Sequence, residues 1–130
     1  MKHYYFEREL LPDNFSFPQT YIEFISHENI PDLEPWWFLC ENEEFAKFWM
    51  EEIAKQYPSR KLVPFAKIED TDDVACFDGS DTSGDPKIYY VHTFAAPGWE
   101  DRGEVENFAT WLEKTEADSA QYKADMVIEN

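Results

Sequence analysis

The residues with the most chemical potential are carboxylates gathered between positions 70 and 85. This segment contains Asp70, Asp72, Asp73, Asp78, Asp81 and Asp85. Oxygen-rich ligand sets suit calcium or magnesium, but the spacing lacks the mid-loop glycine and closing glutamate of an EF-hand. Aspartate also favours turns in its own right. We therefore expect no bound metal and no cofactor, and two interpretations stay open: a solvated turn, or an acidic patch that faces a partner.

A nucleophilic site would need a cysteine activated by a histidine. The chain has two cysteines, Cys40 and Cys76, and three histidines, His3, His27 and His92. Both cysteines lie inside apolar runs, which predicts buried, inert thiols in a reducing compartment. Among the many acids no pair stands out for glycoside hydrolysis. We therefore expect no enzymatic activity, with an unrecognised carboxylate or histidine site as the least favoured alternative.

The tryptophans offer a different kind of chemistry, that of a protein interface. Trp99 follows Pro-Gly and precedes Glu100 and Asp101, so an aromatic anchor would be rimmed by acid. This composition is typical of an interface hot spot. Trp111 and Phe48 fall off the apolar stripes of their helices and are further candidates. The predicted partner-binding residues are Asp70, Asp72, Asp73, Asp81, Trp99, Glu100 and Asp101.

The charge balance limits the class of partner. There are 28 acidic residues against 11 basic ones, a formal net charge of −17. Direct nucleic-acid binding needs clustered lysine and arginine, and anionic membrane surfaces repel such a chain for the same reason. The excess charge either serves solubility or steers the protein toward a cationic partner. We expect a protein partner, and either a monomer or a weak dimer.

The apolar pattern predicts the elements that must position these residues. A helix is expected from Pro18 to about Asn29–Pro31, a short strand at 36–40, and a helix capped by Asn42 that ends near Tyr57. Strands follow at 62–68, 74–77 and 87–94, with Pro64 suited to an edge or strand start. A loop at 97–103 precedes a last amphipathic helix that fades into 116–125. This order predicts an α+β fold, with a mainly antiparallel sheet of about four to six strands flanked by helices, in a single domain over residues 1–130.

Four segments in this order resemble one known family. They are 62–66 (Leu-Val-Pro-Phe-Ala), 73–78 (Asp-Val-Ala-Cys-Phe-Asp), 88–92 (Ile-Tyr-Tyr-Val-His) and 106–112 (Glu-Asn-Phe-Ala-Thr-Trp-Leu). Together with Leu11-Pro12 and the segment 17–24, they resemble the SMI1/KNR4 family, of the SUKH superfamily, over about residues 10–115. One departure is the turn at 69–72, where family members usually carry glycines and this chain has Glu-Asp-Thr-Asp.

The resemblance implies an α+β fold that works by binding protein rather than by catalysis. Bacterial members look like immunity proteins that neutralise a cognate toxin, often a nuclease, and fungal members regulate cell-wall synthesis. We therefore expect an acidic immunity protein that binds a basic toxin domain, with a regulatory interaction module as the alternative. The N-terminus has no signal-peptide core, and no apolar run approaches the ~18 residues of a membrane span. These two observations predict a cytoplasmic location.

Overall fold

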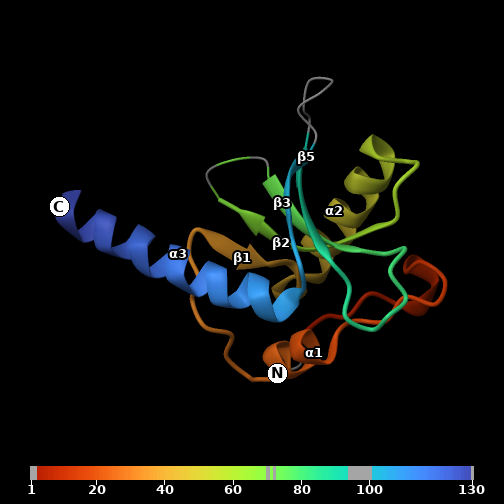
Figure 1. Ribbon diagram of the computed structural model, residues 1–130, viewed down its shortest axis with the longest axis horizontal. Coiled ribbons are helices and arrows are strands. Elements are labelled where there is room, and N and C mark those ends of the chain that lie inside the picture. The colour runs from red at the N-terminus through yellow and green to blue at the C-terminus, as the bar shows by residue number, and fades with distance from the viewer. Residues whose placement is uncertain (1–2, 70, 72, 94–100, 130) are drawn as a thin grey trace.

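The backbone forms one antiparallel sheet with helices packed on it (Figure 1). A computed structural model describes residues 3–69, 71, 73–93 and 101–129. The strands are β1 (Trp36–Phe38), β2 (Leu62–Ile68), β3 (Asp73–Asp78), β4 (Ile88–His92) and β5 (Asp101–Val105). The helices are α1 (Gln19–Ile25), α2 (Glu43–Gln56) and α3 (Phe108–Glu129), with short 3₁₀ turns at Arg8–Leu10 and Leu39–Glu41. The spatial order β1-β2-β3-β4-β5 repeats the chain order, so the predicted α+β fold with antiparallel hairpins is confirmed.

The ends of α1 and α2 follow from local chemistry. Pro18 directly precedes α1 rather than lying in its first turn, and its carbonyl accepts from the N–H of Tyr21 at 3.0 Å. Asn42 caps α2 as expected, because its Oδ1 accepts from the backbone N–H of Phe45 at 3.1 Å. The capping bond satisfies one of the donors that a helix N-terminus leaves open.

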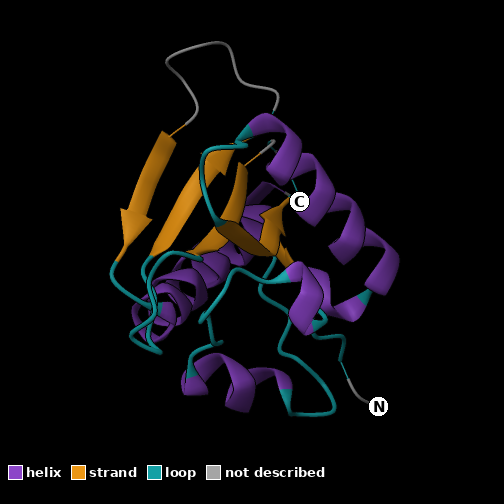
Figure 2. Cartoon of the chain, turned by 90° about the vertical axis from the view of Figure 1, so that its right-hand side faces the viewer, coloured by secondary structure: helices purple, strands orange, loops and turns teal. Residues whose placement is uncertain are grey.

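Helices cover both faces of the sheet (Figure 2). Residues directly opposite each other in neighbouring strands share a face. On one face Phe65 and Phe77 stack with ring centroids 4.3 Å apart, and Phe108 and Trp111 of α3 pack on Phe65 at 5.7 and 4.9 Å. Tyr21 of α1 joins the same cluster. The buried side of α2, with Ala46, Trp49 and Ile53, lies on the other face.

A bulge in β2 decides which residues reach each face. The pairing of β2 with β3 runs Pro64↔Cys76 and then Ala66↔Ala75, so Phe65 is the extra residue. The expectation that Pro64 marks an edge strand was wrong, because β2 lies between β1 and β3. Proline is tolerated there because β1 pairs only with 66–68, which leaves Pro64 without a neighbour on that side.

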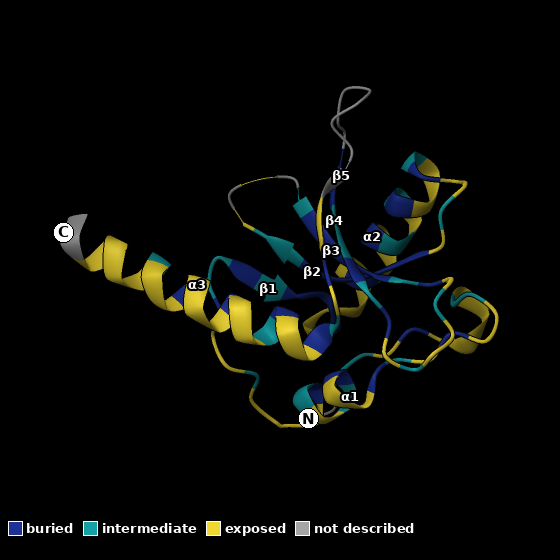
Figure 3. Ribbon diagram, in the orientation of Figure 1, coloured by how far each residue is buried: buried dark blue, intermediate teal, exposed yellow. Residues whose placement is uncertain are grey.

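Two expectations for the last third of the chain were also wrong. The end of the segment expected as a loop, 97–103, belongs to strand β5 (Asp101–Val105), which pairs with β4. The final helix does not fade at 116, since α3 continues to Glu129 and its C-terminal end projects from the sheet with most of its surface exposed (Figure 3). The apolar contacts of α3 come from Phe108 and Trp111, both fully buried, so Trp111 is not available to a partner.

Candidate protein-interaction groove

The predicted partner-binding residues do not form one described cluster. Asp70, Asp72, Trp99 and Glu100 lie outside the described residues, and Asp101 begins β5 with its side chain outside them. The two that are described in full, Asp73 and Asp81, lie at opposite ends of β3. Asp73 is the first residue of the strand, and Asp81 comes three residues after its last residue, Asp78. A strand of that length spans roughly 17 Å. The acids that look dense in sequence are therefore separated by β3.

Asp73 and Asp81, together with the neighbouring Asp78, each have a structural role. Asp73 stands opposite His92 in the pairing of β3 with β4, and its Oδ1 lies 2.8 Å from His92 Nδ1. Asp81 Oδ1 accepts from the N–H of Ser83 at 2.9 Å, and hydrogen bonds from Ser83 lower the pKa of Asp81. Asp78 Oδ1 accepts from the N–H and hydroxyl of Ser80 at 2.9 and 2.6 Å. These are the side-chain-to-backbone bonds that shape turns, so the solvated-turn interpretation accounts for Asp78 and Asp81.

The thiols are buried as expected. Cys40 and Cys76 are both free and buried. Burial raises the pKa of the Cys40 thiol from its ordinary value of 9.0 to about 12, and burial also raises that of Cys76. Since the thiolate is the nucleophile, neither sulfur is activated at neutral pH.

Neither a metal cluster nor a membrane span is found in the described chain. Within the described ranges, no three His, Cys, Asp or Glu side chains are grouped so that they could hold a metal ion. No helix in the same ranges is both long and apolar enough to cross a membrane. Although α3 has 22 residues, its sequence from Glu113 to Asp125 alternates acids and lysines with apolar residues.

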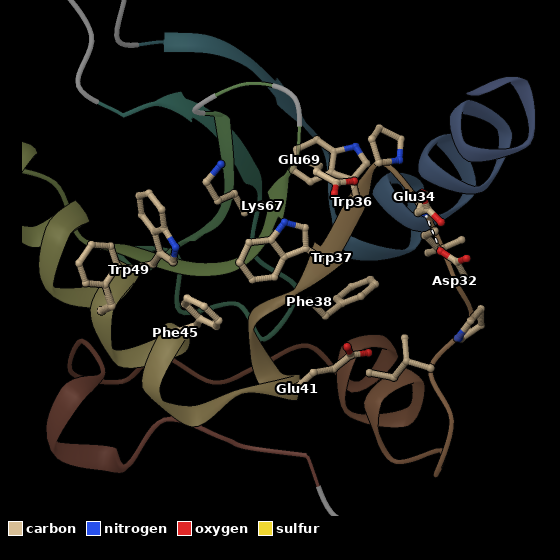
Figure 4. A pocket seen from close by; sticks show the side chains of 15 residues that line it. Asp32, Glu34, Trp36, Trp37, Phe38, Glu41, Phe45, Trp49, Lys67 and Glu69 are labelled. Carbon is tan, nitrogen blue, oxygen red and sulfur yellow. Dashed lines mark hydrogen bonds between the residues drawn. The ribbon is translucent and has the colours of Figure 1, made fainter. Parts of the chain in front are cut away.

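A large hollow in the described surface lies beside β1, on the side of the sheet that α2 covers (Figure 4). Its volume is about 850 Å³. We call it the β1–α2 groove. Its lining comes from the segment before β1, from β1 itself, from α2 and from the end of β2. The residues are Ile30, Pro31, Asp32, Leu33, Glu34, Pro35, Trp36, Trp37, Phe38, Glu41, Phe45, Phe48, Trp49, Lys67 and Glu69.

Aromatic rings form one half of this groove. Trp37 of β1 meets Phe45 of α2 edge to face at 5.6 Å, and Phe48 meets Trp49 in the same way at 5.2 Å. Phe45 and Phe48 are 50% and 48% exposed, although each is a large apolar side chain. Aromatic rings that gather on an exposed surface are typical of protein-interaction sites.

Charged side chains form the other half. The described lining carries four carboxylates, Asp32, Glu34, Glu41 and Glu69, against one base, Lys67. In Figure 4 Trp37 stands in the middle, with Glu69 above it, Glu41 below it, and Asp32 and Glu34 to the right. The same groove thus contains both an aromatic cluster and carboxylates.

Lys67 shows how a cation is held in this groove. Its ammonium lies 5.5 Å from the ring centroid of Trp49 and donates to the carbonyls of Ile68 and Thr71 at 3.1 and 2.8 Å. Tryptophan is the aromatic side chain that attracts cations most strongly. The groove therefore combines ring faces with carbonyl and carboxylate acceptors, which is the chemistry that receives a basic side chain.

Sequence reasoning missed most of this groove. Phe45 was not among the candidates, yet half of its surface is exposed. Phe48, which was a candidate, is also half exposed. A pair of aromatic residues three positions apart, flanked by Glu43, Glu44 and Glu51, is the pattern that could have indicated an exposed aromatic face. The acids before β1 gave no such pattern, because only the fold brings them beside α2.

The fold and groove together define an α+β protein: a five-stranded antiparallel sheet between helices, with an acid-lined aromatic groove at its β1 edge. The family model of the SMI1 / KNR4 family (SUKH-1) matches residues 5–114. The chain belongs to this family. The matched region contains all five described strands. It also contains Phe108 and Trp111, the two residues of α3 whose rings face the sheet. Searches of curated proteins and of solved structures return no significant match.

Proposed function

We propose that this protein is a non-catalytic immunity protein that neutralises a basic, nuclease-type toxin domain in the cytoplasm. The observation that carries the proposal is the β1–α2 groove, where exposed rings and carboxylates meet on a chain of net charge −17. Membership of the SMI1/KNR4 family supports a role in protein binding. The raised pKa of Cys40 supports a role without nucleophilic catalysis.

The mechanism is steric and electrostatic. The excess negative charge speeds encounter with a cationic toxin and disfavours acidic competitors. Once docked, Phe45 and Phe48 lose their remaining exposed surface and supply the desolvated centre of the interface. A nuclease must present a cationic surface to its phosphate substrate. An acidic protein that covers this surface excludes the substrate without any chemistry of its own.

The acids predicted from sequence are proposed as further contacts with the toxin. Asp73 and Asp81 are both partly exposed, and charges at the rim of an interface mainly affect association rate and salt dependence. The full predicted set adds Asp70, Asp72, Trp99 and Glu100, which lie outside the described residues, and Asp101 at the start of β5. We propose that their substitution slows binding, whereas substitution within the groove shortens the lifetime of the complex.

The test is to mix the purified protein with the basic toxin domain encoded beside it. We expect a stable complex by size-exclusion chromatography, and survival of cells that express both proteins. The toxin's catalytic residues stay intact in this assay, so survival reports neutralisation. Absence of a complex together with cell death would reject the immunity role, and capture of a partner involved in cell-wall synthesis instead would indicate a regulatory module.

A further inference from the structure

We propose that the β1–α2 groove receives a short segment of the partner in which an arginine or lysine lies next to a large apolar residue. This inference rests on the proposed function, because it names the chemistry of the partner at the same surface. The basic side chain lies on Trp37 among the carboxylates. The apolar side chain lies on Phe45 and Phe48.

The cationic position follows from carboxylates that have no side-chain partner among the described residues. Asp32 is engaged, since Lys123 Nζ lies 3.8 Å from its carboxylate and donates to its carbonyl. Among the described residues, Glu34, Glu41 and Glu69 make no side-chain ion pair or hydrogen bond. All three line the groove around Trp37 (Figure 4). A cation placed there gains carboxylate acceptors and a ring face at once.

The apolar position follows from rings that are half exposed. Phe45 and Phe48 occupy positions i and i+3 of α2, so they present neighbouring rings on one side of the helix. Trp37 packs on Phe45 edge to face, which fixes that ring between β1 and α2. A leucine or similar side chain seated on these rings removes apolar surface from water on both partners.

Charge complementarity distinguishes this occupant from the alternatives. A second copy of this chain brings another net charge of −17, and an acidic peptide meets the same repulsion. A phosphate or an anionic membrane surface is disfavoured for the same reason. A purely polar basic segment satisfies the carboxylates but leaves the rings of Phe45 and Phe48 in water. A basic and apolar segment satisfies both halves of the groove.

Three synthetic hexapeptides test the proposal on the intact protein. They are Ac-Gly-Leu-Arg-Leu-Arg-Gly-NH2, a variant with serine in place of leucine, and a variant with glutamate in place of arginine. Binding is followed by chemical shifts of the ¹⁵N-labelled protein, with the Trp37 indole signal assigned through Trp37→Phe. We expect the Leu/Arg peptide to shift the signals of the Trp37 indole and of the α2 amides. Its affinity should be at least tenfold higher than that of either variant peptide.

Matched charge variants separate the groove from the general field of the protein. The groove variant combines Glu34→Gln, Glu41→Gln and Glu69→Gln. It should bind the Leu/Arg peptide at least tenfold more weakly than the parent protein. A control variant removes the same charge from exposed positions elsewhere, with Glu106→Gln, Glu113→Gln and Glu116→Gln combined. This variant should lose less than threefold in affinity for the Leu/Arg peptide. Each of three outcomes would overturn the proposal. They are an equal loss of peptide affinity in both triple variants, equal affinity for all three peptides, and no shift of the Trp37 indole signal at millimolar peptide.

Failure here is distinguishable from failure of the immunity role. If the toxin binds and cells survive while the groove triple variant binds toxin normally, the immunity role stands and the groove assignment is rejected. If the Leu/Arg peptide binds the groove but the toxin does not, the groove chemistry stands and the immunity role is rejected.

Discussion

Lys67 lies directly opposite Trp37 in the pairing of β1 with β2, on the face that α2 covers. The bulge at Phe65 produces this relationship, because one extra residue in β2 reverses the facing of every later residue. Without the bulge, Lys67 would point toward the cluster of Phe77 and Trp111. With it, the lysine enters the groove and places its ammonium over Trp49.

Replacing Lys67 with methionine should strengthen binding of cations in the groove. The variant Lys67→Met removes the one base among the described lining residues and keeps a long side chain beside Trp49. We expect the Leu/Arg peptide to bind several-fold more tightly in a fluorescence titration at low salt. The lost hydrogen bonds to Ile68 and Thr71 should lower the free energy of unfolding by about 1 kcal/mol. Weaker peptide binding would show that Lys67 itself contacts the ligand's acceptors.

Truncation of two aromatic residues should lower the free energy of unfolding by very different amounts. Trp111 is fully buried against Phe65 and Phe38, so Trp111→Ala should cost about 3–5 kcal/mol. Phe48 is 48% exposed, and Phe48→Ala should cost less than about 1 kcal/mol. Urea unfolding followed by circular dichroism measures both. Comparable losses in the two variants would mean that Phe48 is covered in solution.

Removing the cap of α2 should weaken the helix that carries Phe45 and Phe48. Asn42→Ala deletes the bond from the N–H of Phe45 and should lower the free energy of unfolding by about 1 kcal/mol. Asn42→Asp keeps the acceptor and adds a negative charge at the positive end of the helix. Its free energy of unfolding should therefore equal or exceed that of the parent. If alanine and aspartate behave alike in urea unfolding, the cap contributes nothing.

Alkaline pH should destabilise the fold through buried groups that resist ionisation. Burial raises the pKa of Cys40 from 9.0 to about 12, and burial likewise raises that of Tyr90 from 10.0 to about 12. The folded state therefore holds these protons more tightly than the unfolded state. The stability they contribute is complete below about pH 9 and is lost as pH rises toward 12.

The expected slope can be measured by urea unfolding between pH 8 and 11. Cys40 contributes up to about 1.4 kcal/mol per pH unit above pH 9, and Tyr90 contributes less because it is partly solvated. The variant Cys40→Ala should have a shallower slope than the parent at the same pH values. A free energy of unfolding that is equal at pH 8 and pH 10.5 would contradict this account.

The sequence predicts the parts of this fold that depend on local patterning. The Asn42 cap and the apolar spacing of α2 each depend on residues a few positions apart. The bulge at Phe65 could not be predicted, because it is set by pairing with β3 and with the short β1. Strand β5 was also missed, since Asp-Arg-Gly-Glu-Val has turn-like composition and pairs only because β4 lies beside it.

The candidate site was less predictable than the fold. Acid and exposed aromatic residues were expected to meet at a partner surface. In the described chain they meet in the β1–α2 groove, among residues that do not belong to the predicted set. Glu69 lines the same groove as Trp37 only because the end of β2 pairs with β1, which no local pattern contains. Asp73 and Asp81 are near in sequence yet separated by β3, because a strand between two turns moves them apart.

The most direct measurement is the affinity of the cognate toxin domain for the double variant Phe45→Ala and Phe48→Ala. Both side chains are half exposed, so the variant should remain folded by circular dichroism. Isothermal titration calorimetry should then show at least a hundredfold loss of affinity, equivalent to about 2.7 kcal/mol. A folded double variant that binds the toxin within threefold of the parent would contradict the assignment of the groove as the partner surface.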